Sequence, residues 1–128
     1  MTFLLDTRTF LWLLRAPENL PSPVRAIAAE PSNDLALSVV TPWEMAIKAS
    51  LGKLDAAGIL DNFERLVELA GYSILETTIS HVIRGGRLPL HHKDPFDRLL
   101  AAQALELQLP LLSGDEAFDW YGVHRIWD

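Results

Sequence analysis

The chain has 128 residues, of which 49% are hydrophobic, and it carries a formal net charge of −6 and no cysteine. This length fits one domain with a real core, and the absence of cysteine excludes disulfides and thiolate metal sites. The negative charge argues against holding nucleic acid by bulk electrostatics, and the longest uncharged run is too short for a membrane span or a signal peptide. We therefore expect a single domain over residues 1–128 that works in the reducing cytoplasm.

Short apolar strands alternate with helical patterns in the first half of the chain. Thr41 followed by Pro42 and Glu44 matches a capping box, which predicts that a helix begins there and ends near Gly52. Ser22 followed by Pro23 is a similar start signal. The predicted elements are strands at 2–5 and 35–38 and helices at 10–15, 22–30 and 41–52.

The second half continues the alternation. Asp94 followed by Pro95 predicts a helix that begins at Asp94. That helix is apolar around most of its circumference, so we expect it to be buried on more than one side. The other predicted elements are helices at 56–70 and 77–83, the second ending at Gly85-Gly86, strands at 72–75, 109–112 and 123–127, and a short helix ending near Gly122.

This alternation predicts an α/β architecture with a mainly parallel sheet of four to five strands and helices on its flanks. In such a fold the connecting helices begin at the carboxyl edge of the sheet, where ligands bind. Four acids fall where a predicted strand ends or a helix begins, namely Asp6, Glu44, Asp97 and Asp115. We expect the fold to bring them to one edge.

Clustered carboxylates repel one another unless cations neutralise them, and oxygen ligands without cysteine suit Mg²⁺ or Mn²⁺. Such an ion activates water for phosphodiester hydrolysis. A purely structural interpretation is open for each acid alone, because Glu44 and Asp97 stand where helix caps and the helix dipole favour an acid. The four together favour a metal site.

Other residues are weaker candidates. His91 and His92 are adjacent and point in different directions, so a loop or phosphate contact is expected in place of metal ligation. The four tryptophans are expected in the core or at an interface. Surface or ordinary structural roles are expected for His81 and His124, and contacts with phosphates or ion pairs for Lys48, Lys93 and Arg98.

These residues carry a family resemblance. The chain resembles PIN-domain ribonucleases, specifically the VapC-type toxins of type II toxin–antitoxin pairs. The resemblance covers essentially the whole chain in the family's order, and the matching pieces are Leu4–Thr7, Leu11–Leu14, Ser38–Lys48, His92–Ala104 and Leu111–Asp115 with Phe118.

The resemblance implies a three-layer PIN fold and an endoribonuclease that depends on Mg²⁺ or Mn²⁺, with Asp6, Glu44, Asp97 and Asp115 as its catalytic and metal-binding acids. It also implies an RNA substrate, a homodimer and a VapB-type antitoxin that covers an apolar groove, which agrees with the high hydrophobic content. Asp119 is a candidate auxiliary acid.

Two alternatives remain at this stage. A phosphatase or phosphotransfer domain of the haloacid-dehalogenase or receiver kind also places acids around Mg²⁺, but the dehalogenase type requires an Asp two residues after its nucleophile, where this chain has Arg8. A non-catalytic protein-binding module with the same fold is the other alternative, and the complete set of four acids argues against it.

Overall fold

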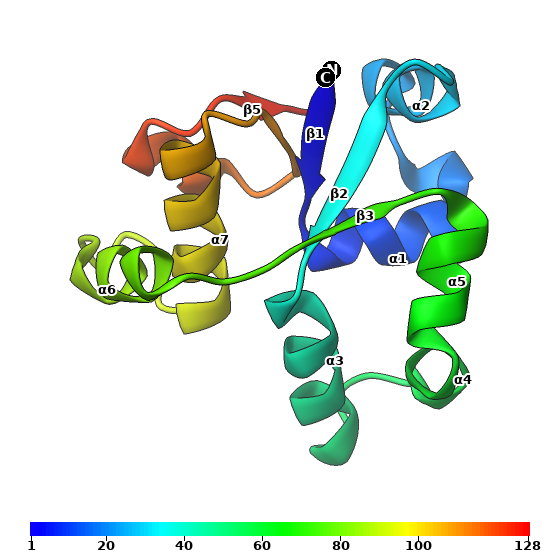
Figure 1. Cartoon of the computed structure of the whole chain (residues 1–128), viewed down its shortest axis with the longest axis horizontal. Coiled ribbons are helices and arrows are strands. Elements are labelled where there is room, and N and C mark those ends of the chain that lie inside the picture. The colour runs from blue at the N-terminus through cyan, green and yellow to red at the C-terminus, as the bar shows by residue number, and fades with distance from the viewer.

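β1 (Thr2–Leu5) is the central strand of a five-stranded sheet in the computed structural model, which describes residues 1–128. The strand order is β3-β2-β1-β4-β5 and every pairing is parallel (Figure 1). The predicted parallel α/β fold is confirmed. The other strands are β2 (Asp34–Ser38), β3 (Ser73–Leu75), β4 (Leu111–Leu112) and β5 (Arg125–Ile126), the last two shorter than predicted.

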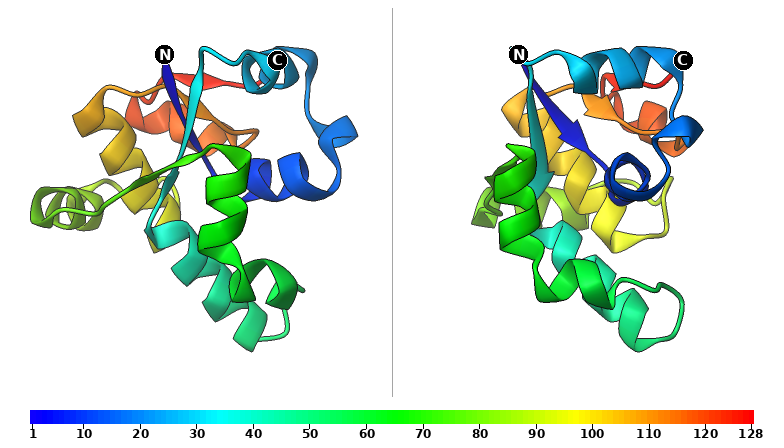
Figure 2. Two further views of the ribbon diagram at one scale, coloured as in Figure 1. Left: turned by 45° about the vertical axis from the view of Figure 1, so that its right-hand side comes forward. Right: turned by 90° about the vertical axis from the view of Figure 1, so that its right-hand side faces the viewer.

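Helices cover both faces of the sheet, which gives three layers. α1, α2 and α5 pack on one face and α7 on the other, with α6 outside α7, while α3 extends from the edge of the sheet opposite the N-terminus (Figures 1 and 2). Their bounds are α1 (Thr7–Arg15), α2 (Ser22–Ala29), α3 (Val40–Ser50), α4 (Ala57–Asp61), α5 (Phe63–Ala70), α6 (Ile79–Arg87) and α7 (Pro95–Leu107), and two 3₁₀ helices, η1 (Pro17–Asn19) and η2 (Glu116–Tyr121), complete the chain. None of the helices combines the length and the apolar character needed to cross a membrane.

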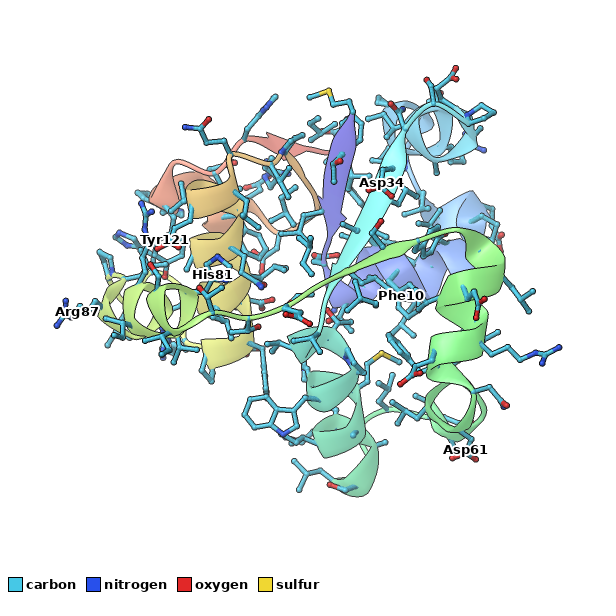
Figure 3. All side chains as sticks on the ribbon, in the orientation of Figure 1. Phe10, Asp34, Asp61, His81, Arg87 and Tyr121 are labelled. Carbon is cyan, nitrogen blue, oxygen red and sulfur yellow. The ribbon has the colours of Figure 1, made fainter.

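Successive residues of β1 pack into two separate cores. Leu5 lies with Phe10 of α1 and Phe63 of α5 in one core, and Phe10 is labelled on that side of the sheet in Figure 3. Leu4 lies with Ala101 of α7 in the other. Side chains alternate between the faces of a strand, so a strand covered on both faces is apolar at every position. This explains the uninterrupted apolar run at the start of the chain.

The predicted capping box at Thr41 is wrong. α3 begins one residue earlier, at Val40, whose N–H donates to Ser38 Oγ at 3.2 Å, and Thr41 is buried without capping the helix. The chain passes directly from the buried end of β2 into the helix. Glu44 is therefore not used as a capping residue, and its carboxylate is available for other contacts.

Two further helix boundaries differ from the predictions. The helix predicted over 56–70 is divided at Asn62, which has a non-helical backbone (φ −127°, ψ 25°), into α4 and α5. Gly85 and Gly86 do not end α6, which continues to Arg87. The reason is packing, because a Cβ at Gly85 would lie 3.1 Å from Leu99 Cα of α7, so this glycine lets the two helices approach.

The two glycines of α6 provide a matched test of that packing. Nothing lies within 4 Å of a Cβ built on Gly86, so Gly86→Ala is expected to be neutral or to stabilise by up to ~1 kcal/mol through helix propensity. Gly85→Ala forces its methyl group against the α7 backbone, and its free energy of unfolding is expected to be about 1–3 kcal/mol lower than that of Gly86→Ala. Urea unfolding of both variants measures this difference, and equal stabilities would contradict the packing argument.

Candidate active site

The structure brings the four predicted acids together. Asp6, Glu44, Asp97 and Asp115 all line one cleft of about 1010 Å³ at the carboxyl edge of the sheet. Asp6 follows β1, Asp115 follows the neighbouring strand β4, and Glu44 lies in α3, which leaves the sheet at the end of β2. Asp97 is in the first turn of α7. The expectation that the fold assembles these acids at one edge is confirmed.

Asp6 is the most buried of the four acids, with 7% of its surface exposed. It is the N-cap of α1, which begins at Thr7 and not at Phe10 as predicted. Its Oδ1 accepts from Thr9 N–H at 2.8 Å and its Oδ2 accepts from Ser113 Oγ at 2.5 Å. Burial raises the pKa of Asp6 although these hydrogen bonds and the charge of Arg8 lower it. The same carboxylate thus caps a helix and faces the cleft.

Glu44 is held from two sides. Thr7 Oγ1 donates to its Oε1 at 2.7 Å, and Lys48 Nζ donates to its Oε2 at 2.5 Å. Lys48 Nζ also lies 3.7 Å from Asp94 Oδ2. Burial lowers the pKa of Lys48, but the hydrogen bond to Glu44 and the charges of Glu44, Asp94 and Asp97 raise it overall. Lys48 is therefore a fixed positive charge within the acidic site.

Asp97 has the most clearly perturbed pKa in the cleft. Burial, with the charges of Asp94, Glu44 and Asp6, raises the pKa of Asp97 to about 7, and His92 opposes the shift. A carboxyl group with such a pKa marks a place where negative charge is crowded and poorly solvated, which is typical of functional sites.

His92 joins the acids, which the sequence did not predict. Its Nε2 lies 2.7 Å from Asp115 Oδ2 and 3.0 Å from Asp97 Oδ2. Ligand atoms of His92, Asp97 and Asp115 all lie within 4.8 Å of one another. The signal that could have found it is its position two residues before the Asp94 cap, because the turn into α7 directs the ring back toward the first turn of that helix.

Most other candidates lie outside the site. Asp119 forms an ion pair with Arg125 at 2.9 Å and does not line the cleft. Arg98 donates to the carbonyl oxygens of His92 and Lys93 and so fixes the loop before α7. His81 completes a capping box with Thr78 at the start of α6.

The tryptophans divide into two pairs. Trp12 and Trp127 pack against the core with ring centroids 6.0 Å apart, as predicted. Trp43 and Trp120 are 59% and 72% exposed, so they are not core residues. For these two residues the predicted place at an interface stays a prediction.

The donor set of the cleft fits a hard divalent cation. It offers carboxylate oxygens from four separate elements. Burial raises the pKa values of Asp6 and Asp97, and neighbouring acids raise that of Asp97 further, so a bound cation would stabilise the ionised form of both groups. Basic side chains line the same cleft, namely Arg8, Arg15, Lys48 and Lys53. A cleft lined by both carboxylates and basic groups suits a phosphate-containing substrate that binds with a divalent cation.

A model of the PIN domain matches residues 3–123. The chain belongs to the PIN-domain family. No curated protein sequence is significantly similar to it. Several solved structures have the same fold, and this PIN domain aligns with them over nearly its whole length.

A chain of VapBC-1 from nontypeable Haemophilus influenzae aligns with a TM-score of 0.68 and 20% identity, over 98% of this chain and 97% of that chain. VapBC2 from Rickettsia felis, bound to a DNA fragment from its promoter, aligns with a TM-score of 0.69 and 16% identity over 100% of both chains. FitAcB from Neisseria gonorrhoeae aligns with a TM-score of 0.64 and 19% identity, over 98% of this chain and 96% of that chain. These likenesses confirm the predicted three-layer PIN fold.

The raised pKa of Asp97 predicts how stability depends on pH in the presence of chelator. Between about pH 4 and pH 7 the native state binds more protons than the unfolded state, so the free energy of unfolding falls as pH rises through this range. Asp97→Asn removes this loss and is expected to raise the free energy of unfolding by about 1–3 kcal/mol at pH 8 and by less at pH 5.

Urea unfolding at both pH values checks this expectation. Glu68→Gln, which replaces an exposed acid of α5, is the control and should change stability little at either pH. A destabilised Asp97→Asn protein at pH 8 would contradict the predicted crowding of charge.

Proposed function

We propose that this PIN domain is a metal-dependent endoribonuclease that acts as the toxin of a type II toxin–antitoxin pair. The observation that carries the proposal is the convergence of Asp6, Glu44, Asp97 and Asp115 on one cleft of a PIN fold. The fold likeness to VapBC and FitAB complexes supports the toxin assignment.

The four acids have two kinds of role in the proposed reaction. Asp6, Asp97 and Asp115 would hold Mg²⁺ or Mn²⁺, and Asp6 is kept in place by Ser113 and the first turn of α1. Glu44, oriented by Thr7 and Lys48, would ligate the ion or orient the attacking water. When bound, such an ion lowers the pKa of a water molecule and stabilises the negative charge on the leaving oxygen.

Substrate binding in this proposal depends on the basic side chains that line the cleft more than on the net charge of the chain, which is −6. Arg8, Arg15 and Lys53 line the cleft with the acids. The Arg8 guanidinium lies 5.8 Å from the centre of the Trp12 ring, which limits its freedom. These cations would contact RNA phosphates, while the acids would hold the ion that offsets the charge of the scissile phosphate.

An antitoxin and a second copy of the chain are the proposed protein partners. The fold likeness to chains of VapBC and FitAB supports the proposal that the present chain acts with a VapB-type antitoxin. Large apolar side chains remain exposed on several elements, as expected for a chain that is partly covered by partners. They include Val39, Trp43, Leu51, Leu69, Ile79, Val82, Ile83, Leu90 and Trp120.

The geometry favours hydrolysis over the two alternatives. A phosphotransfer enzyme of the dehalogenase type needs an acid at position 8, where Arg8 packs on Trp12. A non-catalytic binding module has no need for four acids in one cleft, two of them with raised pKa values. A stable acyl-phosphate on Asp6 after incubation with a phosphodonor would favour the first alternative.

The proposal predicts RNA cleavage that requires both a divalent ion and Asp97. Purified protein free of antitoxin is incubated with a mixed RNA pool and Mg²⁺ or Mn²⁺, with or without chelator. Asp97→Asn keeps the shape but weakens ligation, so its cleavage rate is expected to fall by more than about 100-fold, beyond the effect of a residue that merely orients a ligand.

Asp61→Asn changes an exposed acid of α4 outside the cleft and is the matched control, expected to cleave at the wild-type rate. Cleavage that persists in chelator or in Asp97→Asn would overturn the proposal. A folded wild-type protein that neither cleaves RNA nor arrests growth when it is expressed would favour the binding module.

A further inference from the structure

We propose that His92 is a positioning residue of the metal site, which donates its Nε2–H to the carboxylate of Asp115, holds that of Asp97 beside it at 3.0 Å and does not bind the metal itself. This inference rests on the proposed function, because it concerns the same site. His92, Asp97 and Asp115 are close enough together to bind one metal ion. Whether His92 is a metal ligand or a hydrogen-bond donor therefore depends on which of its ring nitrogens carries the proton.

The hydrogen-bond partners of His92 assign its tautomer. The backbone N–H of Asp94 donates to His92 Nδ1 at 3.1 Å, so Nδ1 is an acceptor without a proton. The proton of the neutral ring is then on Nε2, which faces Asp115 Oδ2 at 2.7 Å and Asp97 Oδ2 at 3.0 Å. Both neighbours of Nε2 are acceptors, as a donor requires.

Ligation through Nε2 would require the opposite tautomer. The proton would move to Nδ1 and meet the N–H of Asp94, so two donors would face each other at 3.1 Å. Direct ligation by His92 therefore requires the loop before α7 to lose this hydrogen bond. As arranged here, the ring acts on the carboxylates and leaves metal binding to their oxygens.

The backbone of His92 is held as firmly as its ring. Its N–H donates to Tyr121 Oη at 2.8 Å, and Tyr121 Oη donates to Pro89 O at 2.6 Å. Arg98 donates to the His92 carbonyl oxygen at 2.9 Å. Tyr121 is labelled beside α7 in Figure 3. A loop that is otherwise partly exposed thus presents one ring in a fixed orientation.

The two oxygens of each carboxylate, in Asp97 and in Asp115, have different neighbours. His92 meets only the Oδ2 atoms of Asp97 and Asp115, and Asp115 Oδ1 accepts from Ala117 N–H at 3.0 Å. Asp97 Oδ1 has no hydrogen bond within the protein. His92 Nε2 thus holds the carboxylates of Asp97 and Asp115 next to each other before a cation arrives, which lowers the free-energy cost of assembling the site around the ion.

The tautomer is tested directly on the metal-free full chain. Long-range ¹⁵N–¹H NMR of ¹⁵N-labelled protein identifies the protonated ring nitrogen of each histidine, and His92→Gln assigns the signal of His92. A proton on Nε2 of His92 is expected. A proton on Nδ1 with a bare Nε2 would overturn the inference, and this measurement needs no variant that alters the site other than for assignment.

Mn²⁺ titration followed by electron paramagnetic resonance tests the role in metal binding without RNA. His92→Ala is expected to weaken Mn²⁺ binding by about 10–100-fold, as loss of an orienting hydrogen bond does in other metal sites. His92→Gln retains an N–H donor of similar reach and should recover most of the affinity. His91→Ala is the matched control, because His91 stacks near Trp120 and Tyr121 and should leave the affinity unchanged.

Electron spin-echo modulation separates positioning from ligation. Wild type and His92→Gln loaded with Mn²⁺ should show the same ¹⁴N coupling, since no imidazole nitrogen binds the ion. An imidazole coupling present in wild type and lost in His92→Gln would overturn the inference while leaving the proposed metal site intact. A wild-type protein that binds no Mn²⁺, or an Asp97→Asn protein that binds it equally well, would instead overturn the proposed site, and the inference with it.

Discussion

The parallel pairing of β1 with both β2 and β4 is the constraint on which the site depends. Because all three strands run in the same direction, the segments that follow them leave at the same edge of the sheet. Asp6, Glu44 and Asp115 reach the cleft through this arrangement, and the first turn of α7 adds Asp97. The two cores fix the strands by burying Leu4 and Leu5 on opposite faces, so packing on both sides of the sheet determines where the carboxylates lie.

Much of this arrangement could be predicted from the sequence. Apolar runs bounded by polar residues located the strands, and Asp94-Pro95 located the start of α7, because these signals are local and strong. The four acids could be assigned to one edge because the position of a residue relative to its strand is retained in any parallel α/β fold. The direction of each carboxylate could not be predicted, since it depends on partners such as Ser113 and Thr7 that are distant in sequence.

The wrong predictions have both local and tertiary causes. Ser38 started α3 before the capping signal at Thr41, and the close approach of α7 gave Gly85 a place inside a helix. His92 was assigned to a loop or phosphate contact because adjacent histidines point in different directions, but the fold directs one of the two, His92, to the acids. The neighbours that decided the places of Gly85 and His92 are Leu99 and Asp115, which belong to other elements, and no spacing rule within a single element reveals such contacts.

The hydrogen bond between Ser113 and Asp6 joins residues that are 107 positions apart. Asp115 and β4 come from the same late segment, so a chain still being synthesised lacks one of the four acids and the anchor of another until residue 115 has been added. A ribosome-bound fragment can bury Leu4 and Leu5 only in part, because β1 lacks its β4 neighbour. The order of translation thus keeps the acidic centre incomplete until Asp115 has been added, which separates the time at which β1 is made from the time at which the site can act.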